Sequence, residues 1–264
     1  MIGRIFLACM IFVLIPAGPA GAAASGSDVP PPKYGPAGAP HAAPLWQSHG
    51  YLQTARNPAP DFWKLITHYV GQESSLSCSV AAVTMVLNAI SRTREDLRAS
   101  DANVQQAGVI EKVKAAHWKE RVTAGGWNGR VGLTLAELEE AVRGALVAYG
   151  IRGWTTTLRS FPAADAGALA ELRAILAANE ASADDFVLLH FLQDKLTADP
   201  GGPYAHISPV GAYDAASDRV LVLDVDREYY GPYWVGLERL LIALDTSTPA
   251  YGRGGLLILR RTAR

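Results

Sequence analysis

One segment constrains the fold more than any other. Ser79 to Ile90, with the sequence SVAAVTMVLNAI, is apolar almost all the way around a helix. A helix on the surface would carry polar residues along one side, so this segment predicts a helix buried inside a core. The chain can supply that core, because its 264 residues are 49% hydrophobic and only 19% charged. The same balance excludes a disordered chain.

Cys78 comes directly before this segment and so falls at the start of the predicted helix. The first turn of a helix presents N–H groups without intrahelical partners and the positive end of the helix dipole. Both stabilise a thiolate, which is the nucleophilic form of cysteine. An inert cysteine that packs as a small apolar residue is the alternative, and it would more naturally lie in the middle of a helix. The position therefore favours a reactive thiol.

The first residues are typical of a secretory signal peptide, predicted over residues 1–24. The apolar run Ile5 to Ile15 is followed by small residues that allow cleavage after Ala22 or Ala24. A run this short does not comfortably span a bilayer, so we expect no integral membrane segment in the mature chain. The expected location is outside the cytoplasm, either periplasmic or secreted. Of the two cysteines in the chain, only Cys78 would remain.

Residues 25–60 hold eight of the sixteen prolines and are predicted to form an extended or disordered leader. Residues 61–264 are predicted to form one α+β domain, with helices first and an antiparallel sheet second. Thr134 and Glu137 have the spacing of a capping box, and a second, alanine-rich helix is expected over residues 164–179. The segments with strand character are Phe186 to Leu192, Ile207 to Tyr213, Val220 to Val225 and Leu256 to Arg260.

A thiolate nucleophile needs a base, and three histidines are candidates. His206 follows a Gly-Gly-Pro turn and opens a strand, a placement typical of site residues. His68 lies shortly before Cys78 and could also come near it, whereas His190 lies inside an apolar strand. Neither alternative to His206 is excluded by position alone.

A carboxylate is expected beside His206 from the pairing of the next two strands. If Tyr213 faces Arg219 across the turn, His206 faces Asp226, and Asp224 becomes its diagonal neighbour on the same face. A β-bulge would shift this register. Either aspartate could then orient the imidazole.

Other features narrow the chemistry. Gln72, six residues before Cys78, could donate a hydrogen bond to an oxyanion, although a glutamine in a loop is usually only polar. No CxxC or HxxxH spacing occurs, so no metal site is expected. With 24 basic and 25 acidic residues, the chain has no cationic surplus for binding nucleic acid.

Taken together, these residues resemble the phytochelatin synthase family, glutathione γ-glutamylcysteinyltransferases with a papain-like cysteine protease fold. The resemblance covers about residues 60 to 260 and is closest to the short bacterial forms. It differs before the histidine, where Pro203-Tyr204-Ala205 separates His206 from the two glycines. The matching text is Gln72 to Ala89, Gly132 to Leu138, His206 to Tyr213, Leu223 to Val225, Tyr230 to Val235 and Arg253-Gly254.

The resemblance implies a role for each matching residue. Cys78 would be the nucleophile, His206 the general base, Asp224 its orienter and Gln72 part of an oxyanion hole. The residues implied in substrate binding are Arg253, which would hold the α-carboxylate of a γ-glutamyl group, and His190, Gly202 and Tyr230.

The implied reaction cleaves the Cys–Gly bond of glutathione through a γ-Glu-Cys thioester and passes the acyl group to a second glutathione or to water. The implied partners are glutathione and γ-glutamyl peptides, in a heavy-metal response. No cofactor would be tightly bound; cadmium or zinc would enter as a glutathione thiolate complex. A processing cysteine peptidase and an inactive binding domain remain alternatives. The pattern does not distinguish a monomer from a homodimer.

Overall fold

The computed structural model describes residues 32–92, 97–198 and 201–262. The predicted signal peptide, residues 1–24, lies outside the described residues. The described chain belongs to one compact unit, Pro31–Arg264. No helix within the described ranges is long and apolar enough to cross a membrane.

The centre of this unit is an antiparallel sheet of seven strands in the order β1-β6-β5-β4-β3-β9-β2. A two-stranded ribbon, β7 with β8, lies outside it. The strands are β1 (Ala42–Pro44), β2 (Trp154–Arg159), β3 (Asp185–Leu192), β4 (Ala205–Asp214), β5 (Arg219–Val222), β6 (Tyr233–Gly236), β7 (Ser247–Thr248), β8 (Gly252–Arg253) and β9 (Gly255–Arg261).

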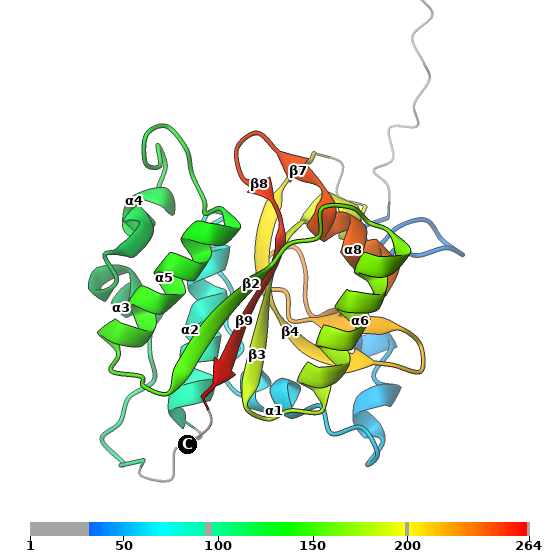
Figure 1. The fold of residues 1–264 in the computed structure, drawn as a ribbon, viewed down its shortest axis with the longest axis horizontal. Helices are drawn as coiled ribbons and strands as arrows, with labels where there is room; N and C mark the ends of the chain where they lie inside the picture. The colour runs from blue at the N-terminus through cyan, green and yellow to red at the C-terminus, as the bar shows by residue number, and fades with distance from the viewer. Residues whose placement is uncertain (1–31, 93–96, 199–200, 263–264) are drawn as a thin grey trace, which may run out of the picture. The chain divides into compact units, whose positions relative to one another are not determined.

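Helices cover both faces of this sheet (Figure 1), with α2 and α5 on one face and α6 and α8 on the other. The α-helices are α1 (Pro60–Ile66), α2 (Cys78–Arg92), α3 (Gln106–Lys112), α4 (Trp118–Arg121), α5 (Leu135–Ala148), α6 (Ala166–Glu180), α7 (Gln193–Leu196) and α8 (Leu237–Asp245). Short 3₁₀ turns occupy Leu45–Gln47, Gly50–Gln53 and Ala115–His117.

The sheet therefore separates two hydrophobic cores. Along β3, Phe186 and Leu188 pack into the core beneath α2 and α5, while Val187 and Leu189 pack into the core beneath α6 and α8. Successive side chains of a strand point to opposite faces, so a sheet covered on both faces needs strands that are apolar throughout. This requirement explains why β3, β4 and β5 are buried along almost their whole length, whereas the edge strand β2 alternates.

The α+β class, the antiparallel sheet and the cysteine at a helix N-terminus are confirmed. Helix α2 begins at Cys78, and its residues from Ser79 to Ile90 are all buried. The Thr134–Glu137 capping box opens α5. The expectation that the helices precede the sheet is wrong in detail, since β1 and β2 come before the predicted helix α6 and α8 follows β6.

The boundary predicted at residue 61 is also corrected. Ala42–Pro44 forms the edge strand β1, which pairs with β6, so part of the proline-rich segment belongs to the folded unit. Tyr34 packs against Tyr230 and Tyr233 with ring centroids 6.0 Å from each. Proline is compatible with an edge strand, because the edge needs no donor on its outer side.

The β4–β5 hairpin contains the bulge on which the carboxylate prediction depended. Next to the turn Tyr213 pairs with Val220, one residue away from the predicted partner. The register shifts between Val210 and Ala212, and beyond the shift Val210 pairs with Val222. The pairing of Val210 with Val222 is the predicted one. The bulge thus restores the predicted register, which is wrong by one residue at the turn, in the part of β4 that leads to His206.

Candidate active site

The nucleophile candidate is presented by a turn that opens α2. Ser77 Oγ donates to the Ser74 carbonyl and accepts from the Ser74 amide, which fixes the approach to the helix. The Ser77 carbonyl accepts the amides of Val80 and Ala81 at 3.0 and 3.1 Å, so Cys78 is the first residue of the helix proper. Its thiol is partly exposed and reduced. The amides of Cys78 and Ser79 precede these bonds, so the start of α2 directs N–H groups and the positive end of the helix dipole toward the thiol.

The structure brings His206 and Asp224 into direct contact. His206 Nε2 lies 2.9 Å from Asp224 Oδ1, in the pairing expected from the diagonal position. Asp224 is completely buried and His206 is 7% exposed. The ring edge of His206 also packs against Phe191, with centroids 5.5 Å apart. A buried carboxylate bonded to one nitrogen holds an imidazole in a single orientation.

Asp224 is itself held in place from three directions. Its Oδ1 accepts the Asp226 backbone amide at 2.9 Å. Its carbonyl oxygen accepts a short hydrogen bond from the Tyr69 hydroxyl. The next residue, Val225, donates its amide to Ser208 Oγ and accepts the Gln72 amide. The carboxylate therefore has little freedom to turn away from His206.

The charge state of His206 follows from these neighbours. Burial disfavours the imidazolium, but the negative charge and the hydrogen bond of Asp224, with a further interaction from Cys78, outweigh burial and hold the pKa of His206 well above its ordinary value. Because Nε2 is occupied by Asp224, Nδ1 is the nitrogen available to the Cys78 thiol. The imidazolium can therefore stabilise a thiolate.

Gln72 lies on the loop before α2, where its amide is anchored to the Val225 carbonyl at 2.8 Å. Its side chain lines the same cavity as Cys78 and His206. Gln72 Oε1 is buried and makes no hydrogen bond to any described residue. Oε1 is an acceptor, whereas an oxyanion hole needs a donor, so in that role the Nε2 of the same amide would have to face the oxyanion.

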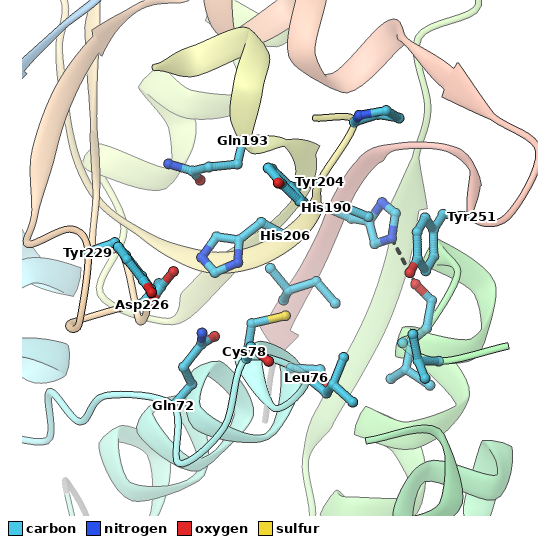
Figure 2. Close-up of a pocket in the computed structure, with 18 of the residues that line it drawn as sticks. Gln72, Leu76, Cys78, His190, Gln193, Tyr204, His206, Asp226, Tyr229 and Tyr251 are labelled. Carbon is cyan, nitrogen blue, oxygen red and sulfur yellow. Dashed lines mark hydrogen bonds between the residues drawn. The ribbon is translucent and has the colours of Figure 1, made fainter. Parts of the chain in front are cut away.

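These side chains face a cavity of about 480 Å³. Figure 2 shows the thiol of Cys78 pointing into it, with His206 above, Gln72 and Asp226 on one side and His190 and Tyr251 on the other. A cavity of this size accommodates a small peptide rather than a folded protein. The remaining lining residues include Ser75, Leu76, Val131, Leu133, Gln193, Pro203, Tyr204, Tyr229 and Tyr230.

Of the four residues implied in substrate binding, the structure places two in the cavity. His190 and Tyr230 line it. His190 is 2% exposed, and its Nε2 lies 2.9 Å from the Leu133 carbonyl oxygen. Burial lowers the pKa of His190, so the ring is neutral, Nε2 carries the proton and Nδ1 is an acceptor. No described residue bonds to Nδ1, which leaves an unmet acceptor at the cavity wall.

The other two, Arg253 and Gly202, are not among the lining residues, so their predicted roles need correction. Arg253 Nη1 forms a short ion pair with the Asp245 carboxylate at the end of α8 and also bonds to the Phe161 carbonyl. One nitrogen of its guanidinium is therefore already engaged. Gly202 packs against Asp194, and an added Cβ would meet the Asp194 carboxyl carbon at 2.4 Å. The cavity wall at this position is Pro203.

Sequence reasoning missed several residues that line the cavity. Tyr229 and Tyr251 lie in turns and Gln193 begins the short helix α7, so no periodicity marks them. Asp226 was considered only as a partner for His206, and it lines the cavity instead. His68, the alternative base, lines a different and smaller cavity with Thr84 and Asn88.

A thiol at a helix N-terminus, an imidazole beside it and a buried carboxylate behind the imidazole define the class of cysteine-nucleophile sites that transfer acyl groups through a thioester. Within the described ranges, no group of three or more histidine, cysteine or acidic side chains is arranged to hold a metal ion.

Comparison with known proteins agrees with this class. A family model described as phytochelatin synthase matches residues 47–254. The chain belongs to the phytochelatin synthase family.

Among curated relatives, glutathione gamma-glutamylcysteinyltransferase 3 of Lotus japonicus is 27% identical over 212 residues, covering 77% of this chain and 38% of the relative. Glutathione gamma-glutamylcysteinyltransferase 1 of Triticum aestivum is 45% identical over 60 residues, covering 22% of this chain and 12% of the relative. The chain thus spans well under half the length of these relatives. A solved structure, Pseudomonas avirulence protein AvrPphB, aligns with 13% identity and a TM-score of 0.30 over 75% of this chain and 100% of that one.

Proposed function

We propose that this protein cleaves the Cys–Gly amide bond of glutathione and transfers the γ-Glu-Cys group to another γ-glutamyl peptide or to water. The observation that carries the proposal is that Cys78 and His206 line one peptide-sized cavity, with the buried Asp224 bonded to His206 from behind. Membership of the phytochelatin synthase family supports the choice of glutathione as substrate.

In the first step the Cys78 thiolate attacks the carbonyl carbon of the scissile amide. The oxyanion that forms is stabilised by the N–H groups of the first turn of α2 and by the Gln72 side chain. His206, kept protonated by Asp224, then gives its proton to the departing glycine nitrogen. The C–N bond breaks, and γ-Glu-Cys remains as a thioester on Cys78.

In the second step the neutral His206 takes a proton from the attacking group. Water yields free γ-Glu-Cys, whereas the amine of a second glutathione yields a lengthened peptide. In both cases the C–S bond breaks and Cys78 leaves as the thiolate that began the cycle. Asp224 stabilises the imidazolium that forms again.

The direct test is to incubate the purified chain with glutathione and identify the products by mass spectrometry, with and without cadmium. Free glycine together with γ-Glu-Cys or (γ-Glu-Cys)n-Gly is the expected result. The Cys78→Ala variant should release no glycine, because no second thiol in the described chain can form the thioester. Equal glycine release by this variant would refute the mechanism.

A processing cysteine peptidase would use the same three residues but would accept ordinary peptide bonds. The cavity of about 480 Å³ beside the thiol is lined by residues from several segments, which favours a short substrate over an extended chain. Cleavage of α-linked peptides at rates equal to those for glutathione would favour the peptidase instead.

The setting of the reaction is part of the proposal. The sequence of residues 1–24 supports export to the periplasm or the exterior, which fractionation of cells expressing the full chain would test. A role in heavy-metal detoxification would follow if cadmium or zinc enters as a thiolate complex of the substrate. Faster product formation with the metal complex than with free glutathione is the expected result.

A further inference from the structure

One carboxylate in the cavity has no part in the steps described so far. Asp226 lines the cavity together with Cys78 and His206, and its side chain is half-buried. Its hydrogen bonds to other described residues all use its backbone: its amide donates to Asp224 Oδ1, and its carbonyl accepts the amides of Tyr229 and Tyr230. The backbone is thus anchored while the carboxylate stays available to a ligand.

The carboxylate lies near the reacting atoms rather than at a distant wall. Figure 2 places Asp226 beside Tyr229 on the Gln72 side of His206, away from His190 and Tyr251. Burial raises the pKa of Asp226, and the positive charge of His206 partly offsets that effect, so the two groups interact electrostatically.

The surroundings of Asp226 suit a cation. No lysine or arginine is among the described residues that line the cavity, whereas four tyrosines are, namely Tyr204, Tyr229, Tyr230 and Tyr251. Lys33, from outside the cavity, lies over the rings of Tyr229 and Tyr230 and its charge reaches Asp226, so this side of the cavity already attracts one ammonium group. Aromatic faces attract ammonium groups, and a half-buried carboxylate gains from pairing with one. A second carboxylate brought to this point would meet repulsion.

The chemistry of transfer decides which ammonium group fits. In the donor, the γ-glutamyl amine is separated from the thioester carbonyl by a whole cysteine residue and the glutamyl side chain. In the acceptor, the γ-glutamyl amine must come within bonding distance of that same carbonyl and within reach of His206. A carboxylate that lines the same cavity as Cys78 and His206, on the Gln72 side of His206 (Figure 2), is therefore placed for the acceptor amine.

We propose that Asp226 positions the acyl acceptor, by binding the ammonium group of the incoming γ-glutamyl peptide and so favouring transfer over hydrolysis. The inference rests on the proposed function. The acceptor arrives as an ammonium ion, releases one proton to solvent and keeps an N–H hydrogen bond to the carboxylate. Its nitrogen attacks the thioester carbon, the C–N bond forms, the C–S bond breaks, Cys78 leaves as the thiolate, and the second proton passes to His206.

The test compares the wild type with Asp226→Asn in glutathione supplemented with S-methylglutathione as acceptor. The measured quantity is the ratio of transfer product to free γ-Glu-Cys, which normalises for any change in total glycine release. Loss of a hydrogen bond to a charged group predicts that the ratio falls about tenfold or more. Hydroxylamine, which is uncharged at neutral pH, serves as a second acceptor, and transfer to it should not fall in this way. Glu228→Gln is the matched control, because Glu228 is exposed and does not line the cavity.

Each other outcome overturns the inference. An unchanged ratio in Asp226→Asn, an equal fall for hydroxylamine, or an equal fall in Glu228→Gln would show that Asp226 does not select the acceptor. A wild type that releases glycine but transfers to no amine would do the same while leaving hydrolysis intact. A wild type that releases no glycine would instead refute the proposed function, so the two failures are distinguishable.

Discussion

The two parts of the cavity differ in how firmly the protein holds them. At the reaction centre, Asp224 is completely buried and His206 is 7% exposed, and each is fixed by its neighbours. At the rim, Tyr204 and Tyr229 are 47% and 56% exposed and lie on loops. The chemistry therefore depends on the packed sheet and α2, whereas recognition depends on segments that can vary at little cost to the fold.

The largest loss of activity is expected when Asp224, the carboxylate that orients His206 at the reaction centre, is replaced. Asp224→Asn keeps the size of the side chain but removes the charge that keeps His206 protonated and oriented. Glycine release should fall on the order of 10³-fold to 10⁴-fold. Steady-state assay of Asp224→Asn beside Asp226→Asn measures this; an equal loss in both would show that the two aspartates do not have separate roles.

The pH dependence of glycine release is a second test of the reaction centre. Because Asp224 raises the pKa of His206, the imidazolium that protonates glycine should persist above the ordinary histidine range. The basic limb of kcat/KM for glycine release should therefore lie above that range and move down in Asp224→Asn. The same pair should stabilise the fold fully below about pH 6.5 and lose this contribution as the pH rises through the raised pKa. A basic limb that does not move in Asp224→Asn would contradict the assignment.

A smaller effect on activity is expected from replacing His190, which belongs neither to the reaction centre nor to the exposed rim of the cavity. His190→Phe removes the neutral acceptor Nδ1 at the cavity wall together with the bond to the Leu133 carbonyl. Loss of one substrate hydrogen bond predicts a rise of about tenfold in the KM for glutathione, with kcat nearly kept. Thermal unfolding controls for damage to β3, and His190→Gln should restore part of the affinity. A fall in kcat alone would place His190 in the chemistry instead.

The smallest effect is expected at the rim. Tyr204→Ala removes an exposed side chain from the loop before His206, and kcat/KM should change by about twofold to threefold. Initial rates over a range of glutathione concentrations would measure it. A loss as large as that of Asp224→Asn would show that the rim is as essential as the reaction centre, and the comparison would fail.

Sequence reasoning could predict the reaction centre because the sequence patterns that mark its residues are local. Cys78 precedes a uniformly apolar helix, and His206 and Asp224 lie on adjoining segments whose pairing follows from a short turn. The register was one residue out at the turn and correct beyond Val210, because the bulge could not be seen in the strand pattern.

The substrate side could not be predicted in the same way, because its residues meet only through tertiary packing. Arg253 is taken up by Asp245, the last residue of α8, a helix that the sequence analysis did not predict. In the matching pair Arg253-Gly254, packing alone explains the glycine. A Cβ at residue 254 would lie 2.2 Å from the His190 carbonyl oxygen, so this crossing requires glycine. Loop residues such as Tyr251 follow no period that a pattern could reveal.

The bulge beside Gly211 gives the β4–β5 hairpin two independent registers. The turn sets the pairing of Tyr213 with Val220, while the inner segment sets the pairing of Val210 with Val222. A Cβ on Gly211 would lie 2.9 Å from the Leu223 side chain, so the bulge is matched to a close approach of the two strands. Asp218 at the end of the turn is held by Arg173 and by the Tyr213 hydroxyl. The exposed tip at residues 215–217 can by contrast be lengthened or replaced by an epitope tag, because the change of register at the bulge separates it from His206. This makes the tip the natural place to attach a probe to the working protein.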